Sequence, residues 1–366
     1  MKQTLLQWRE RLLTSPTFHQ FATTFPLTRP IVRQRQSELF DLVAGFVYSQ
    51  ILAAVVELDL LDHVAGRGKT ISEIATLTGL GDDEARRLLD GAVSLRLLQK
   101  SGNRYQQGDL GSALAINPGV KAMIRHHGAF YADMKDPVGL LRKGRGKTEL
   151  SRLWDYALSD APAASTADDV SAYTTLMSES QAMVAAEILA AVSFEDHDRL
   201  LDVGGGDGTF LTAIGKAQPH LELRLFDLPA VADRAALKFE AEGLGQRAQT
   251  FGGSFFDDNL PTGADLASLV RILHDHDDGP ALAILKAVHR ALPKGGRLIV
   301  CEPMSTGASA HRISDAYFNF YLYAMGSGRP RPPEMIEEML EAAGFSRVYR
   351  VPTRSPLITS ILSAHK

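Results

Sequence analysis

Cysteine is the scarcest residue of this chain, because only Cys301 stands among 366 residues. A single cysteine excludes a disulfide within the chain and is typical of a reducing compartment. Its setting, RLIVCEP, has the apolar character of a buried strand. We therefore expect an inert core thiol there, not a nucleophile.

Basic charge is not in excess either. The formal net charge is -4 and the pI is near 6.3, whereas a nucleic-acid-binding protein needs a strongly basic surface. The composition, 45% hydrophobic and 22% charged, is that of ordinary globular proteins, and 366 residues predict about two domains. We expect a two-domain globular protein without a nucleic-acid partner.

Apolar runs are too short to cross a bilayer. The longest, at residues 42–56, has 15 residues, and about 20 are needed. It predicts a buried core helix or an interface helix. The N-terminus, MKQTLLQWRERLLTS, lacks the unbroken apolar region of a signal peptide. We expect a cytoplasmic protein, in which amphipathic residues 1–13 form a dimer-interface helix or, as the alternative, a peripheral membrane contact.

Residues 1–60 have the spacing of helices, and a different pattern follows them. Thr70, with Glu73 three residues later, predicts a capping box, and a second helix is expected within residues 81–99. Two short strands around a Gly-Asn turn at Gly102 then predict a hairpin. Two helices followed by a hairpin are the winged-helix pattern.

Three arginines of this module suggest a DNA-reading helix as one interpretation: Arg86, Arg87 and Arg96. Such a helix needs basic and amide side chains together on one face. The arginines are instead interrupted by four acids: Asp82, Asp83, Glu84 and Asp90. We therefore expect a structural module that helps to form a homodimer.

Strands and helices alternate from residue 199 onward, after a mostly helical stretch with the linker DAPAASTADD. Strands are expected at RLLDVGG, ELRLFDLP, DLASLVRIL and GGRLIVCEP, with helices between them. This alternation predicts an α/β fold with a Rossmann-like, doubly wound parallel sheet. We expect an N-terminal α-helical dimerisation and winged-helix domain at 1–115 and an α/β domain at 116–366, with its core at about 195–366.

The stretch LLDVGGGDGTF is the most specific motif of the chain. A strand ends at Asp202, and glycines then allow a ligand to approach backbone amides at a helix start. Gly204, Gly206 and Gly208 give G-x-G-x-G, not the G-x-G-x-x-G of hydride-transfer proteins. Asp202 disfavours a pyrophosphate and suits a ligand with a cationic amino group.

Asp227 follows the second strand, 19 residues after Gly208, near the distance at which an acid meets a ribose diol. A helix N-cap is the alternative, and the place directly after a strand favours nucleoside binding. An adenosine, an ammonium group and no phosphate together describe S-adenosyl-L-methionine, which is the cofactor we expect.

Five stretches occur in order: LLDVGGGDGTF, FDLPAV, GGSFFDDNLP, RILHDHDD and LPKGGRLIVCEPM. With them the chain resembles the caffeic acid and acetylserotonin O-methyltransferase family of class I S-adenosylmethionine-dependent enzymes, over most of residues 199–345. The stretches at residues 25–62 and DAYFNFYLYAMGSGRPR are similar to hydroxyneurosporene (demethylspheroidene) O-methyltransferases. The resemblance implies methylation of a hydroxylated acyclic carotenoid, as in spheroidene-type carotenoid biosynthesis of photosynthesis.

The resemblance also implies a set of cofactor contacts, in which Asp227 would hold the ribose. The set is Gly204, Gly206, Asp227, Leu228, Gly253, Ser254, Phe255 and Arg271. Two positions depart from the family pattern. Ser254 stands where the family has Asp, and His276 stands where it has Trp.

The stretch HDHDD follows a strand, where ligand residues of α/β proteins collect. A hydroxyl nucleophile must lose a proton, which a neutral imidazole can accept, and the resemblance gives His274 this role. A metal site is the alternative. We take His274 and His276 to alternate along an extended segment and to face apart, and we expect no metal. Asp275, and Asp277 or Asp278, are expected to cap the next helix.

Glu302, in CEPM, matches the family's first acid supporting the catalytic His, while Pro330 stands where the second acid falls. Either Glu302 alone supports His274, or catalysis depends more on positioning, as suits a weakly acidic alcohol. An aromatic helix is expected to wall an apolar substrate cavity. Its residues on one face are Tyr317, Phe320, Tyr321 and Ala324.

We therefore expect a homodimeric O-methyltransferase with a hydrophobic, carotenoid-type substrate. Two alternatives inside the enzyme class are O-methylation of a phenolic or polyketide molecule and C-methylation of a bacteriochlorophyll-type ring. An alternative from another class is a winged-helix regulator that binds the cofactor without catalysis. The intact His274 favours oxygen methylation and an active enzyme.

Overall fold

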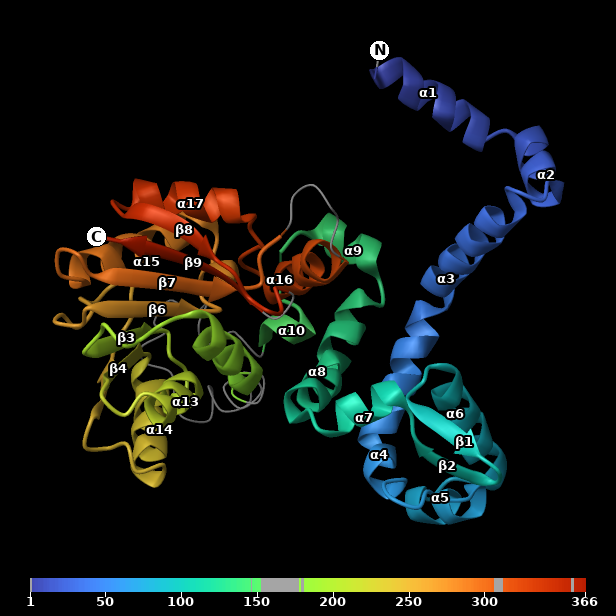
Figure 1. Ribbon diagram of the computed structural model, residues 1–366, viewed down its shortest axis with the longest axis horizontal. Coiled ribbons are helices and arrows are strands. Elements are labelled where there is room, and N and C mark those ends of the chain that lie inside the picture. Colours follow the sequence, from blue (N-terminus) through green and yellow to red (C-terminus); the bar gives the residue numbers. More distant parts are fainter. Residues whose placement is uncertain (1, 146, 153–177, 179–180, 306–311, 357–358) are drawn as a thin grey trace. The chain divides into compact units, whose positions relative to one another are not determined.

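The computed structural model describes residues 2–145, 147–152, 178, 181–305, 312–356 and 359–366, so the linker DAPAASTADD lies outside the described residues. The chain divides into two compact units, Met1–Ile116 and Asn117–Lys366 (Figure 1).

The first unit is helical apart from one hairpin. Its helices are α1 (Lys2–Leu13), α2 (Pro16–Thr24), α3 (Arg29–Glu57), α4 (Leu60–His63), α5 (Ile71–Thr78), α6 (Asp82–Ser94) and α7 (Asp109–Ala115). Strands β1 (Leu98–Ser101) and β2 (Arg104–Gln107) pair antiparallel. The helices predicted before residue 60 and the predicted hairpin are thus confirmed.

Local sequence explains how this unit folds. Thr70 and Glu73 form the predicted capping box, in which the Thr70 hydroxyl accepts from the Glu73 amide and the Glu73 carboxylate accepts from the Thr70 amide. Leu89 of α6 and Tyr105 of β2 are fully buried in the core. Arg87 pairs with Asp83 one helical turn earlier, so part of the basic charge of α6 is neutralised within the helix.

The expectation that the apolar run is too short to cross a bilayer is wrong for helix α3, because the helix extends beyond that run. By length and composition α3 is long and apolar enough to cross a membrane, a test that soluble core helices and signal sequences also pass. Only 11% of its apolar window is buried within the chain. The expectation of a buried core helix is therefore wrong for the single chain. The other predicted role, that of an interface helix, is still open to α3. The large exposed side chains of the α3 segment from residue 39 are Leu39, Phe40, Leu42, Val43, Phe46 and Val47.

The second unit is built on a seven-stranded sheet with the order β5-β4-β3-β6-β7-β9-β8. The first five are parallel, and β9 and β8 add antiparallel strands. The strands are β3 (Arg199–Val203), β4 (Glu222–Asp227), β5 (Ala248–Gly252), β6 (Leu266–Val270), β7 (Arg297–Glu302), β8 (Ser346–Val351) and β9 (Ser360–His365). The predicted mostly parallel sheet is confirmed.

Helices cover both faces of this sheet (Figure 1). The covering helices are Gln181–Ala191, α13 (Thr209–Ala217), α14 (Pro229–Ala241), α15 (Asp278–Ala291) and α17 (Pro333–Ala342). Four more helices of the described residues lie to one side of the sheet: α8 (Pro118–Met134), α9 (Pro137–Lys143), α10 (Glu149–Arg152) and α16 (Asn319–Met325). One apolar core lies between the sheet and α15 with α17, and a second between the sheet and α13 with α14. This double cover fits strands that are apolar on both sides.

Two local features differ from the prediction. Strand β5 was not expected, because it is a half-buried edge strand without an apolar run. Strand β6 ends at Val270, three residues before the end of the strand predicted from the apolar stretch DLASLVRIL. Arg271 takes a φ of 60°, and one turn of 3-10 helix, Leu273–Asp275, follows. The side chains of DHDD therefore belong to a tight turn and a helix start, not to a strand.

We expect Gly111→Ala to destabilise the first unit, because a Cβ there would lie 1.8 Å from the Leu97 carbonyl oxygen. Such overpacking costs about 1–3 kcal/mol of unfolding free energy, measured by urea titration. The matched control is Gly128→Ala in α8, where nothing lies within 4 Å of a Cβ. It should be neutral or stabilise by up to about 1 kcal/mol. Equal effects of both variants would contradict the close approach of α7 to Leu97.

Candidate active site

The glycine turn connects β3 to α13 at the carboxyl end of the sheet. Gly204, Gly206 and Gly208 have φ angles of 73°, 60° and 79°, a region that other residues rarely adopt. A Cβ on Gly204 would lie 2.4 Å from Ile272, whereas nothing lies within 4 Å of one on Gly206. The backbone at Gly206 is thus open to a ligand.

Asp227 reaches across to this turn. Its carboxylate accepts hydrogen bonds from the Gly206 amide at 2.8 Å and the Leu228 amide at 2.7 Å. Burial raises the pKa of Asp227 to about 6, although these two bonds oppose the rise. Leu228, not Asp227, occupies the N-cap position of α14, so the N-cap interpretation of Asp227 is wrong.

Asp202 lies at the end of β3 beneath the glycine turn and is 1% exposed. The Ser268 hydroxyl of β6 donates to it at 2.6 Å. Burial raises the pKa of Asp202 to about 7, and the negative charge of nearby Asp227 adds to the rise. Two acids close together in a low-dielectric site favour a cationic ligand group.

The loop after β5 holds the predicted Gly253-Ser254-Phe255 turn beside these acids. The Gly253 amide donates to the Asp227 carbonyl at 2.9 Å. The Ser254 hydroxyl accepts from the Phe256 amide at 3.2 Å, while the Ser254 amide donates to the Asp258 carboxylate at 2.8 Å. The Ser254 side chain therefore stabilises the loop. The carboxylate that contacts this turn belongs to Asp258, four residues later.

His276 stands where the resemblance leads one to expect Trp, and it too packs as an aromatic. Its ring meets those of Phe255 and Phe256 edge-on, with centroids 5.4 and 5.5 Å away. Burial lowers the pKa of His276 to about 4, so the ring is neutral at physiological pH. The loop after β5 and the turn after β6 are thereby joined through apolar ring contacts.

His274 lies in the 3-10 turn after β6 and is 4% exposed. Its Nε2 lies 3.0 Å from Asp275 Oδ1, and its backbone amide donates to Glu302 Oε2 at 3.1 Å. Its Nδ1 is 4.0 Å from Glu302 Oε2, too far for a hydrogen bond. Among the described residues, His274 Nδ1 and Glu302 Oε1 have no hydrogen-bond partner.

Burial and the neighbouring carboxylates act in opposite directions on the pKa of His274. Burial disfavours the imidazolium, but the carboxylates of Asp275 and Glu302 outweigh burial and raise the pKa of His274. Burial raises the pKa of Glu302, partly offset by His274 and Arg331. The sequence missed Asp275 as the nearest partner of the ring, because neighbours in a strand would face apart.

The predicted helix caps need correction. Asp275 is buried against His274 and caps nothing. Asp277 occupies the N-cap position of α15, but its side chain makes no capping bond and instead accepts from Arg145 and the Gly328 amide. Asp278 binds Arg329 and Arg331. These acids anchor the segment near residue 330 to the turn.

The extended-segment argument against a metal is also wrong. Residues two apart in a strand lie on the same face, and His274 lies in a 3-10 turn while His276 is extended. Within the described part of the chain, no group of three or more His, Cys, Asp or Glu side chains could hold a metal ion. Cys301, on β7, is fully buried, and burial raises the pKa of its thiol, as an inert core position requires.

Arg271 precedes the turn, and its amide donates to the Cys301 carbonyl at 2.8 Å. Its positive charge acts on the pKa of both His274 and Tyr317, so all three groups lie in the same region. The predicted contacts at the carboxyl ends of β3, β4, β5, β6 and β7 are therefore brought to one edge of the sheet.

The aromatic helix begins as a π-helical turn, Arg312–Phe318, and continues as α16. Tyr317 and Tyr321 still stack, with centroids 5.7 Å apart. Their hydroxyls are bonded to His127 and His126 of α8, at 2.8 and 2.9 Å. Burial lowers the pKa of both histidines, so these pairs are neutral. The predicted residues Phe320 and Ala324 pack in the same cluster.

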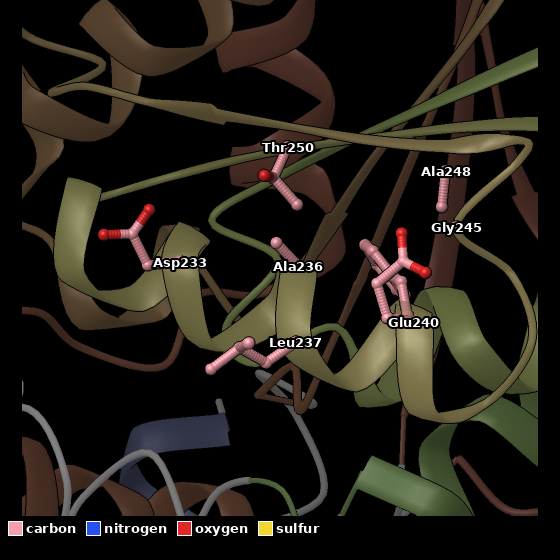
Figure 2. A pocket seen from close by; sticks show the side chains of 8 residues that line it. Asp233, Ala236, Leu237, Glu240, Gly245, Ala248 and Thr250 are labelled. Carbon is pink, nitrogen blue, oxygen red and sulfur yellow. The ribbon is translucent and has the colours of Figure 1, made fainter.

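A pocket of about 410 Å³ lies at a different place. Figure 2 shows the side chains that line it. It lies between α14 and the edge strand β5, with Asp233, Leu237 and Glu240 on the helix and Ala248 and Thr250 on the strand. None of the predicted catalytic or cofactor residues lines it. The pocket is a surface depression beside the sheet edge and plays no part in the candidate active site.

Two family models match the chain. An O-methyltransferase domain matches residues 131–346, and an O-methyltransferase dimerisation domain matches residues 40–117. The chain therefore belongs to the O-methyltransferase family, in which a helical dimerisation domain precedes the catalytic domain.

Two relatives are similar over nearly the whole chain. The demethylspheroidene O-methyltransferase of Cereibacter sphaeroides is 44% identical over 97% of this chain and 93% of the relative. That of Rhodobacter capsulatus is 41% identical over 97% of this chain and 88% of the relative.

Among solved structures, CalO1 is a methyltransferase in calicheamicin biosynthesis described in an SAH-bound form. It is 26% identical, with a TM-score of 0.75 over 91% of this chain and 98% of that chain. Human N-acetylserotonin methyltransferase, 24% identical with a TM-score of 0.75 over 91% and 98%, shares the fold.

We expect Asp202→Asn to remove a pH-dependent instability. A carboxyl whose pKa is raised on folding favours the folded state at low pH, and this advantage is lost as the pH rises from about 4 to about 7. The unfolding free energy of the variant relative to wild type should therefore increase by about 2 kcal/mol between pH 5 and pH 8.

The measurement is urea unfolding at both pH values. Asp233→Asn, at an exposed position of α14, is the matched control and should show no such increase. A pH-independent difference for Asp202→Asn would mean that its carboxyl is solvated or ionised in the folded protein.

Proposed function

We propose that this enzyme transfers a methyl group from S-adenosyl-L-methionine to a hydroxyl of an acyclic carotenoid of the demethylspheroidene or hydroxyneurosporene type. The supporting observation is the similarity to two demethylspheroidene O-methyltransferases over 97% of the chain. The products would belong to spheroidene-type carotenoid biosynthesis. The site itself supports an O-methyl transfer through its glycine turn and its buried His274.

The residues at the carboxyl edge of the sheet fit the cofactor. The open backbone at Gly206 leaves room for the methionine part, and the buried Asp202 carboxylate suits its ammonium group. Asp227 keeps free lone pairs for the ribose hydroxyls after accepting two amides. Leu228 would lie beside the adenine. The proposed contacts are completed by Gly204, Gly253, Ser254, Phe255 and Arg271. When bound, S-adenosyl-L-methionine supplies an electrophilic methyl group on a sulfonium.

His274 is the proposed base. Its ring must be neutral to accept the hydroxyl proton of the substrate, and Asp275 lies at Nε2 to stabilise the imidazolium that results. Glu302 is the proposed support, and in this structure it fixes His274 through the backbone amide. Pro330 stands in place of the family's second acid, and Asp275 is the carboxylate that meets the ring. Because an alcohol is a weak acid, positioning of the substrate is expected to contribute much of the rate.

The aromatic cluster is the proposed substrate wall. The hydroxyls of Tyr317 and Tyr321 are already bonded to histidines, so these side chains offer ring faces with few free polar atoms. Phe320 and Ala324 extend the same apolar surface, and Phe318 lies with its ring centroid 6.3 Å from that of His274. Such a wall suits a long hydrocarbon with a single hydroxyl better than it suits a polar molecule.

We expect purified protein with radiolabelled S-adenosyl-L-methionine to label detergent-dispersed hydroxyneurosporene, and neither a small phenol nor a chlorin. His274→Ala should lower kcat about 10²–10⁴-fold, which is the usual contribution of a general base. Because the pKa of His274 is raised, kcat of the wild type should increase with pH above the ordinary histidine range near 6.5.

The matched control is His220→Ala, since this exposed histidine precedes β4, far along the sheet from the site. It should leave kcat unchanged. Label only in the phenol or the chlorin would keep the methyl transfer and exclude the carotenoid. Binding of S-adenosyl-L-methionine without transfer to any acceptor would point to a regulator.

The dimerisation match at residues 40–117 supports a homodimer. The exposed apolar side chains of α3 that fall inside this match, such as Phe40, Phe46 and Val47, are suited to a second copy of the chain. Residues 2–39 lie before the match and differ from it in charge, because most of their charged residues are basic. Residues 1–39 carry six basic and two acidic residues in a chain whose net charge is -4.

We further propose that α1 and α2 touch an anionic membrane surface, where a carotenoid resides. Leu5, Trp8 and Phe21 are exposed by 61%, 64% and 55%, and Arg9 and Arg11 accompany them. Aromatic and leucine side chains next to arginines are typical of helices that lie in the membrane interface. The arrangement would bring a water-insoluble substrate to a protein that is otherwise cytoplasmic.

We expect the protein to sediment with phosphatidylglycerol vesicles and to release from them at high salt. Replacing Arg9 and Arg11 by Gln should weaken this binding about 30-fold, since each basic residue near the surface contributes about 1 kcal/mol. Replacing Arg86 and Arg87, exposed on α6, is the matched control and should have no effect. If the Arg9 and Arg11 variant alters the oligomeric state but not vesicle binding, α1 and α2 pair with a second copy of the chain and not with a membrane.

A further inference from the structure

Arg331 is the largest fully buried side chain of the described residues. Its guanidinium donates to the Leu273 carbonyl at 2.6 Å and to the His276 carbonyl at 2.6 Å. Two further bonds, of 2.8 and 3.0 Å, go to Asp278 Oδ1. A buried guanidinium is costly unless its donors are satisfied, so this position is committed to these acceptors.

The acceptors of Arg331 bracket His274. Leu273 precedes it and His276 follows it, so one planar group fixes both ends of the turn that carries the imidazole. A lysine could not do this, because an ammonium lacks the rigid fork that spans two carbonyls. The backbone carbonyl of Arg331 also accepts from the Ser305 amide, three residues beyond Glu302. Arg331 therefore connects the ends of β6 and β7.

The rest of the same segment completes the attachment. The Arg329 amide donates to the His274 carbonyl at 2.9 Å, and the Ser327 hydroxyl donates to the Asp275 carbonyl at 2.5 Å. The Arg331 guanidinium holds the carbonyls of Leu273 and His276. With these two further bonds, each of the four carbonyls from residue 273 to residue 276 accepts a hydrogen bond from residues 327–331. A turn held at each carbonyl has little freedom to rotate its imidazole.

We propose that Arg331 is a positioning residue, which acts on methyl transfer through His274 by fixing the turn between β6 and α15. This inference rests on the proposed role of His274 as the base. The neighbouring Pro330 stands where the family resemblance places a second supporting acid. The segment that carries Pro330 holds the backbone of the His274 turn instead, while Asp275 meets the ring. The positive charge of Arg331 also partly offsets the rise that burial causes in the pKa of Glu302.

The test compares Arg331→Met with Arg329→Met, its matched control. Arg329 pairs with the same Asp278, but its side chain is 47% exposed, and it holds His274 only through its backbone. We expect Arg331→Met to lower kcat about 10–100-fold, as loss of alignment does, with KM for the acceptor and Kd for S-adenosyl-L-homocysteine within about 3-fold of wild type. Arg331→Lys should lower kcat at least about 10-fold. Arg329→Met should leave kcat unchanged.

A double-mutant cycle separates positioning from general structural support. Once His274→Ala has removed the base, Arg331→Met should change the remaining rate less than about 3-fold. Equal losses in both backgrounds would overturn the inference, because Arg331 would then act independently of His274. If His274→Ala alone has no effect, the proposed base fails while the contacts of Arg331 stand.

Folding of each variant is checked by far-UV circular dichroism and urea unfolding. Should Arg331→Met not fold, the cycle is run with Arg331→Lys, which keeps the buried charge and its bond to Asp278. A full-rate Arg331→Lys enzyme would overturn the inference, since charge alone would then suffice.

Discussion

The active site depends on the parallel register of the central strands. Asp202 of β3 lies level with Ser268 of β6, and Val270 of β6 lies level with Cys301 of β7. Parallel strands in register end at the same edge of the sheet, so the segments that follow them meet there. The glycine turn, Asp227, the His274 turn and Glu302 are separated by up to a hundred residues in sequence, and this register alone brings them together.

Burial gives these groups their chemistry. Apolar cores on both faces of the sheet exclude water from the strand ends, which raises the pKa of Asp202 and Asp227 and makes unpaired charge costly. His274 is as buried as these acids, but two carboxylates raise its pKa against that burial. The site thus combines buried carboxyls of raised pKa with an imidazole whose pKa is also raised. Such an imidazole, when neutral, can take up the proton that the reaction releases.

Much of this was predictable from the sequence, because local patterns determined it. The glycine spacing, the Thr70 capping box and the alternation of strands and helices each depend on neighbouring residues. The missed elements depend on distant ones. Strand β5 forms at an edge because β4 offers it hydrogen-bonding groups, not because its letters are apolar. Asp275 meets the ring of His274 because Arg271, with its φ of 60°, ends β6 early.

The sequence by itself determined the family, the glycine turn and the two residues at the centre of the proposed chemistry, His274 and Glu302, because motifs in their order suffice for that. Only the tertiary structure decided how these two meet. It places Glu302 at the backbone amide of His274 and not at the ring. It also makes Arg331 the support of the turn. The physical reason is that burial and hydrogen-bond satisfaction are set by residues far apart in the chain, and no local pattern records them.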